Sequence, residues 1–112
     1  MQYFNDPALV AATNTGTVLS AAIDSRFYVN VTVQAEFTDG AAAGTLKIQG
    51  SNDPHSPTNW NDVPGMTIAV AAGATVTTPT TATPLCYQWV RVAFVSSAGA
   101  GTITANLHAN GY

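Results

Sequence analysis

Apolar and polar residues alternate along one segment of the chain, residues 27–37. Such a period of two places one set of side chains on each face of a β-strand, and β-branched and aromatic residues favour that conformation. In a helix the same apolar residues would be spread around the whole circumference. The pattern therefore predicts a strand whose inward face consists of Phe27, Val29, Val31, Val33, Ala35 and Phe37.

Similar alternation predicts further strands. Residues 86–95 form a second long strand, with Cys86, Val90, Val92 and Phe94 inward and Tyr87, Trp89 and Arg91 outward. A Pro-rich loop is expected over residues 51–59, and Pro64-Gly65 is expected to end a short strand. Residues 1–7 are interpreted as an N-terminal arm. Shorter strands are predicted at residues 45–49, 60–63, 66–70 and 102–108, and the segments 8–12, 17–20 and 75–78 are candidates for short or peripheral strands.

The predicted elements indicate an all-β fold. Strands separated by turn residues at about ten-residue spacing are typical of a sandwich or barrel. We expect an antiparallel β-sandwich, jelly-roll or Ig-like, of seven or eight strands. The 112 residues contain no internal repeat or linker, so a single domain spanning residues 1–112 is expected.

Charge is unusually scarce. Charged residues make up 8% of the sequence, against about 25% in typical soluble domains. The basic residues are Arg26, Lys47 and Arg91, and the net charge is −3. Nucleic-acid binding is excluded as an interpretation, because it requires clustered Lys and Arg. A surface with so little charge favours coverage by a partner or by copies of the same chain, since exposed proteins rely on charge for solubility.

The residues that carry chemistry are few and dispersed. Cys86 is the single cysteine and is interpreted as a small buried apolar residue. Neither His55, in the loop, nor His108, outward on the last strand, has a second ligand at metal-binding spacing. Asp53 and Asp62 could meet around calcium, but turn capping is the favoured interpretation. We expect no catalytic residues, no cofactor and no metal, hence no enzyme.

Targeting signals also bear on function. No apolar run approaches the roughly 20 residues of a membrane-spanning helix. Residues 1–7 have neither the basic start nor the apolar centre of a secretory signal. We therefore expect synthesis in a host cytoplasm and no membrane partner.

Four segments carry a resemblance to a known class of proteins. They are Thr45–Asp53, Asn59–Gly65, Tyr87–Val92 and Gly101–Asn106. In this order they resemble small β-sandwich structural proteins of tailed bacteriophages, over about residues 27–110 of the sequence. The resemblance implies a virion protein, and among these a capsid decoration (cement) protein fits a chain of this length best. Its partners would be copies of itself and the major capsid protein or other virion proteins. A tail or fibre component remains open.

A second resemblance, to discoidin-like carbohydrate-binding sandwiches, implies a glycan partner. Trp60, Tyr87 and Trp89 would then stack on sugar rings. The alternative, burial of these rings against the sandwich, is favoured because aromatic side chains contribute much of the burial energy of a small core. Tyr3 and Phe4 in the arm, and residues 74–83, are candidate contact elements for a protein partner, because extended segments can add to a sheet edge.

Overall fold

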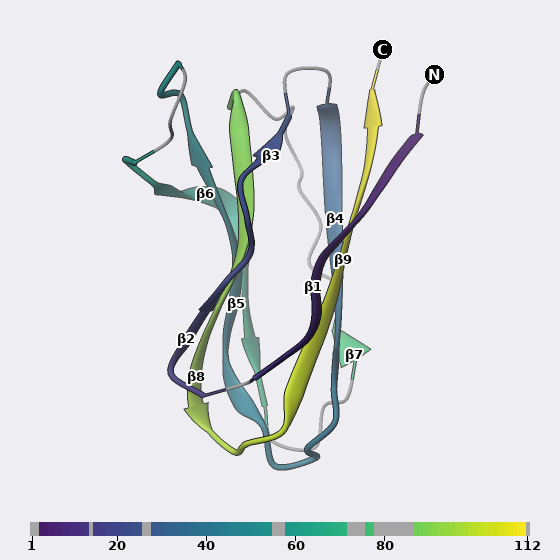
Figure 1. Cartoon of the computed structure of the whole chain (residues 1–112), viewed down its shortest axis with the longest axis vertical. Helices are drawn as coiled ribbons and strands as arrows, with labels where there is room; N and C mark the ends of the chain where they lie inside the picture. Colours follow the sequence, from purple (N-terminus) through teal and green to yellow (C-terminus); the bar gives the residue numbers. More distant parts are fainter. Residues whose placement is uncertain are drawn as a thin grey trace.

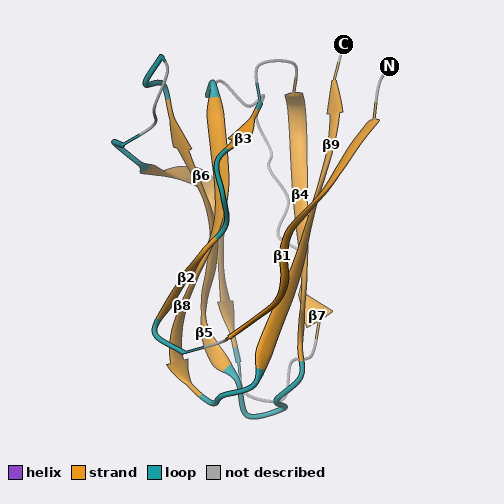
Figure 2. Ribbon diagram, in the orientation of Figure 1, coloured by secondary structure: helices purple, strands orange, loops and turns teal. Residues whose placement is uncertain are grey.

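The computed structural model describes residues 3–13, 15–25, 28–54, 58–71, 76–77 and 87–111, with the backbone alone at positions 3, 4, 28, 29, 76 and 77. The described residues contain strands and no helix. Two antiparallel sheets pack face to face, and the ends of the chain lie at the same end of the sandwich (Figures 1 and 2). The strands are β1 (Tyr3–Thr13), β2 (Thr17–Leu19), β3 (Ile23–Asp24), β4 (Tyr28–Phe37), β5 (Ala43–Ser51), β6 (Asn61–Val70), β7 (Val76–Thr77), β8 (Trp89–Ala98) and β9 (Thr102–Gly111).

The strand order is that of a jelly roll. One sheet runs β1-β9-β4-β7 and the other β2-β8-β5-β6, with β3 also paired to β8. Because β2 and β3 pair with successive parts of β8, they act as one interrupted edge strand. Counted in this way, eight strands form four antiparallel pairs, in which the first strand pairs with the last, the second with the second-last, and so on. These pairs are β1·β9, β2/β3·β8, β4·β7 and β5·β6. The expected sandwich is confirmed, and of its two expected topologies the jelly roll is observed.

The core follows from the alternation in the long strands. Inward positions of both sheets are almost completely buried, and the rings of Phe37 and Phe94 meet across the sandwich with centroids 5.1 Å apart. Burying each large apolar side chain stabilises the fold by about 1.5–3 kcal/mol. The buried residues that the alternation predicts are Val31, Val33, Ala35, Phe37, Leu46, Ile48, Met66, Val70, Val90, Val92, Phe94, Ile103, Ala105 and Leu107. Phe27 and Cys86 lie outside the described residues.

The N-terminal segment differs from the predicted arm. Residues 3–7 belong to β1, whose backbone pairs with β9 from Tyr3 opposite Asn110 to Thr13 opposite Thr102. Two register shifts interrupt this pairing, and Ala11 there has a positive φ of 47°. The polar and Pro-containing start of β1 has no strong alternation, yet the adjoining edge of β9 satisfies its backbone groups.

Strand β6 also differs from the prediction. Pro64 and Gly65 do not end the strand but form a bulge within it, between the pairs Gln49–Asp62 and Lys47–Thr67. Gly65 has a φ of 81°, which glycine adopts without steric cost. The bulge is tolerated because β6 is an edge strand, where a proline removes no hydrogen bond from a second neighbour.

Close packing explains why residue 50 is a glycine. Gly50 is buried on β5, and a Cβ built there would overlap the ring of Tyr87. The Gly50→Ala substitution is therefore expected to lower the free energy of unfolding by about 1–3 kcal/mol, as overpacking does. Denaturant unfolding measures this change. Gly40→Ala is the control, because nothing lies within 4 Å of a Cβ at that position. Equal stability of the two variants would contradict the packing explanation.

Candidate functional site

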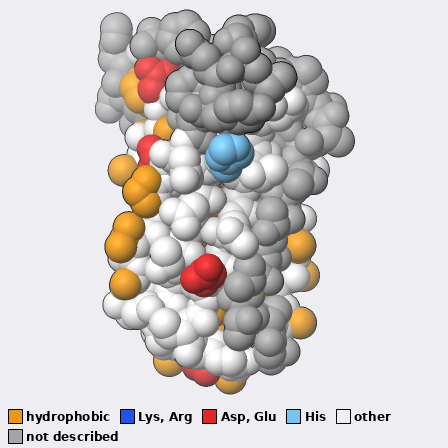
Figure 3. Space-filling model, turned by 90° about the vertical axis from the view of Figure 1, so that its right-hand side faces the viewer, with side chains coloured by type: hydrophobic (Ala, Val, Ile, Leu, Met, Phe, Trp, Pro, Cys, Tyr) orange, Lys and Arg blue, Asp and Glu red, His pale blue; other side chains and the backbone are white. Residues whose placement is uncertain are grey.

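On the described parts of β4 and β9, the outward side chains of the β1-β9-β4-β7 sheet are polar and nearly uncharged. On β4 and β9, the outward positions carry one carboxylate, Glu36, and neither Lys nor Arg. Figure 3 shows this side of the molecule, with a histidine and few acidic groups among uncharged side chains. His108 is exposed there, as predicted. The other outward residues are Asn30, Thr32, Gln34, Thr102, Thr104, Asn106 and Asn110.

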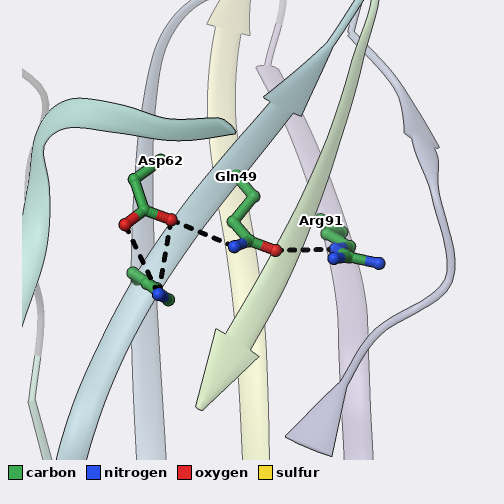
Figure 4. A network of polar contacts seen from close by, with 4 residues as sticks. Gln49, Asp62 and Arg91 are labelled. Atoms are coloured by element: carbon green, nitrogen blue, oxygen red, sulfur yellow. Dashed lines mark hydrogen bonds and ion pairs between the residues drawn. The ribbon is translucent and has the colours of Figure 1, made fainter. Parts of the chain in front are cut away.

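The opposite outer face, on the β2-β8-β5-β6 sheet, carries a row of polar side chains. Gln49 of β5 lies directly opposite Arg91 of β8 on one side and Asp62 of β6 on the other. Arg91 Nε donates a hydrogen bond to Gln49 Oε1 at 2.8 Å, and Gln49 Nε2 donates to Asp62 Oδ1 at 3.0 Å (Figure 4). The amide of Gln49 therefore connects a cation to an anion on a neighbouring strand.

The negative charge of Asp62 is balanced by Lys47, which contacts it in addition to Gln49. Lys47 Nζ lies 3.4 Å from both carboxylate oxygens of Asp62. The hydrogen bond from Gln49, with smaller contributions from Lys47, lowers the pKa of Asp62 below its ordinary value. Because Asp62 is 52% exposed, this ion pair contributes little to stability, about 0–1 kcal/mol.

Arg91 is held on two sides. Besides its bond to Gln49, its guanidinium carbon lies 4.4 Å from the centroid of the Trp60 ring, a cation–π contact. Both side chains are half-buried, and burial lowers the pKa of Arg91. Within the described residues, no ion pair joins Arg91 to a carboxylate.

The loop between β5 and β6 is tied together by Asp53. Its Oδ2 accepts hydrogen bonds from the backbone N–H of Thr58 and of Asn59, at 2.6 and 2.9 Å, and from the Thr58 hydroxyl. The two backbone bonds are the main cause that lowers the pKa of Asp53 to about 2. The backbone carbonyl of Asp53 accepts the Trp89 Nε1–H at 2.8 Å, so the loop is also anchored to β8. Asp53 thus caps the loop, as the turn-capping interpretation expects, whereas Asp62 lies in β6 and contacts the side chains of Gln49 and Lys47.

The predicted aromatic residues occupy three different settings. Trp60, just before β6, contacts Arg91, and Trp89 on β8 donates to the loop. Tyr87 was expected on the same outer face, but this is wrong: it packs against the core, with its ring against Gly50. The reason is that β8 begins only at Trp89, so the alternation does not extend to Tyr87.

The remaining candidates are only partly described. The backbone of Tyr3 and Phe4 lies in β1, opposite Asn110 and Ala109, whereas their side chains lie outside the description. Of residues 74–83, only Val76 and Thr77 are described, as the short strand β7 beside β4. His55 also lies outside the described residues.

Metal-binding clusters and membrane-spanning helices are both absent from the described part of the chain. No group of three or more His, Cys, Asp or Glu side chains there could hold a metal ion. It also contains no helix long and apolar enough to cross a bilayer.

Sequence comparison finds no relative: neither a protein-family model nor a curated protein matches the chain. Structure comparison does find similar folds. The PBSX exported protein XepA superposes with a TM-score of 0.71 at 16% identity, over 97% of this chain and 37% of XepA. The SPBc2 prophage-derived protein YomS gives 0.58 at 12% identity, over 96% of this chain and 92% of YomS. The Yersinia pseudotuberculosis-derived mitogen gives 0.55 at 8% identity, over 99% and 86%.

These likenesses establish the fold. XepA and YomS are phage-derived, whereas the mitogen is named for a different activity, so the same sandwich occurs in proteins of unlike roles. The chain spans little more than a third of the length of XepA. The assignment of a role therefore depends on the surfaces described above.

The carboxylate of Asp53 makes the stability of the loop dependent on pH. Its pKa is about 2 in the folded chain against an ordinary 3.8, so the stabilisation is complete above pH 3.8 and is lost as the pH falls towards 2. We expect Asp53→Asn to lower the melting temperature at pH 6. Between pH 4 and 2 the melting temperature of the wild-type chain is expected to fall, and that of Asp53→Asn to fall less. Thermal unfolding followed by circular dichroism measures both effects. Glu36→Gln is the control for the loss of one carboxylate, and a pH profile of Asp53→Asn parallel to the wild type would contradict the assignment.

Proposed function

We propose that this chain is a non-enzymatic structural protein of a tailed-bacteriophage virion, and specifically a decoration protein that braces the head through protein–protein contacts. The observation that carries the proposal is the nearly uncharged outer face of the β1-β9-β4-β7 sheet. The fold that the chain shares with XepA and YomS is consistent with a phage origin. Copies of the chain and the major capsid protein are the proposed partners.

The free-energy cost of burying a surface in an interface depends on the polar and charged groups that it carries. Burying a charge without a partner costs far more than burying a hydroxyl or amide that finds a hydrogen bond. The face formed by β4 and β9 has Thr, Asn and Gln at most outward positions, so a neighbouring subunit can cover it with little electrostatic penalty. A net charge of −3 over 112 residues also leaves little repulsion between copies held close together. Many identical contacts, each modest, would then stabilise a shell.

A carbohydrate-binding module is the alternative, and the aromatic side chains argue against it. Sugar stacking requires exposed ring faces, whereas Trp60 is stacked by Arg91, Trp89 is bonded to the loop and Tyr87 is packed on Gly50. Each ring already has an intramolecular role. A protein partner therefore fits the surface better than a glycan.

The proposal predicts that the chain is a component of the particle. Mass spectrometry of purified virions from the phage or prophage that encodes it should detect the chain, and the purified protein should co-sediment with particles that lack it. The absence of the chain from virions, together with failure to co-sediment with heads or tails, would contradict the proposal.

The neutral face can be tested by adding a charge. Asn106→Lys places an ammonium group at an exposed position on β9, and we expect it to weaken co-sedimentation at least tenfold, because the charge would be covered without a partner. Ser97→Lys is the matched control: it adds the same charge at an exposed position on β8, in the other sheet. Binding of Asn106→Lys equal to that of the wild type would show that the partner does not cover the neutral face.

A further inference from the structure

We infer that Arg91 is a carboxylate-binding site, through which the chain contacts an Asp or Glu side chain on the surface of a partner protein. This inference deepens the proposed function and rests on it for the identity of the partner as a virion protein. The site consists of Arg91, which binds, and of Gln49 and Trp60, which position it.

Arg91 is fixed before any partner arrives. Its backbone lies within β8, its Nε donates a hydrogen bond to Gln49, and its guanidinium carbon lies over the Trp60 ring. Figure 4 shows Arg91 at the end of the polar row, with one terminal nitrogen directed away from Gln49. A side chain held in this way loses little conformational entropy on binding, which favours affinity.

The charge of Arg91 is not balanced by the row to which it belongs. The group that it contacts, Gln49, is a neutral amide, and the carboxylate beyond it, Asp62, is already paired with Lys47. Among the described residues no carboxylate pairs with this half-buried guanidinium, which has therefore lost part of its hydration without gaining an ion pair there. A carboxylate is the anion that its planar fork matches best, through two parallel N–H···O bonds.

The surroundings of Arg91 favour a protein as the source of the carboxylate. On the same outer face, Leu19 of β2 lies opposite Ala93, two residues along β8 from Arg91, and is 45% exposed. Val95, the next outward residue of β8, is 38% exposed. A strip of apolar side chains beside a fixed Arg and Trp is typical of protein interfaces, where such residues carry much of the binding energy. A partner surface with one acidic group beside apolar side chains would match it.

The carboxylate site is tested on the isolated protein by NMR. Titration with N-acetyl-glutamate amide should shift the Arg91 Nε–H resonance and the Trp60 indole resonance, whereas N-acetyl-glutamine amide, which has the same shape but no charge, should not. Arg91→Gln should abolish the response, and Ser97→Asp, which changes the net charge by the same amount, should retain it. The absence of any carboxylate-dependent shift would overturn the site. Galacturonic acid and N-acetylneuraminic acid are titrated in the same way. If either sugar acid binds at least tenfold more tightly than N-acetyl-glutamate amide, the proposal that the carboxylate comes from a protein is overturned.

The role in assembly is tested on particles. Arg91→Gln should weaken co-sedimentation at least tenfold relative to wild type and to Ser97→Asp. Arg91→Lys should recover less than half of the binding lost in Arg91→Gln, because lysine keeps the positive charge but lacks the planar guanidinium that binds a carboxylate through two hydrogen bonds. Thermal unfolding of each variant verifies that it is folded. If wild type and Arg91→Gln bind particles equally, the inference fails while the proposed function stands. If wild type itself does not bind particles, the proposed function fails, and the NMR titration alone decides the carboxylate site.

Discussion

Strand β5 is held between β8 and β6 by backbone hydrogen bonds, and its register determines both what is buried and what is displayed. Leu46 and Ile48 point into the core, whereas Lys47 and Gln49 point outward. Because side chains alternate with a period of two, a slip of one residue would exchange the two sets. The same register aligns Arg91, Gln49 and Asp62 across three strands, so the polar row depends directly on the pairing that forms the core.

The two outer faces of the sandwich differ in chemistry. On β4 and β9 the described outward side chains are polar and include one carboxylate, Glu36, whereas both basic residues of the described chain, Lys47 and Arg91, lie on the other sheet. With 8% charged residues, the concentration of cations on one face gives the molecule two distinct surfaces. A protein with two such surfaces can make different contacts on its two sides.

The sequence pattern predicts the long strands well and their neighbours less well. Alternation identifies β4, β8 and β9 and most of the buried residues, because burial on one face imposes it. The bulge at Pro64-Gly65 and the pairing of residues 3–7 were not predicted, since both depend on the strand alongside. Likewise, Tyr87 turns inward because Gly50, distant in sequence, leaves space for its ring. The local sequence pattern alone does not determine any of these three features.

The sequence by itself determined that this is an all-β sandwich with little surface charge and few groups capable of chemistry. Local alternation and composition suffice to predict the fold class, because the apolar side chains of each strand mark the face that is buried. Only the tertiary structure decided that the topology is a jelly roll and that Arg91, Gln49, Asp62 and Trp60 meet. Those contacts join residues up to 42 positions apart, such as Arg91 and Gln49, and are set by the register between strands, which no single strand encodes.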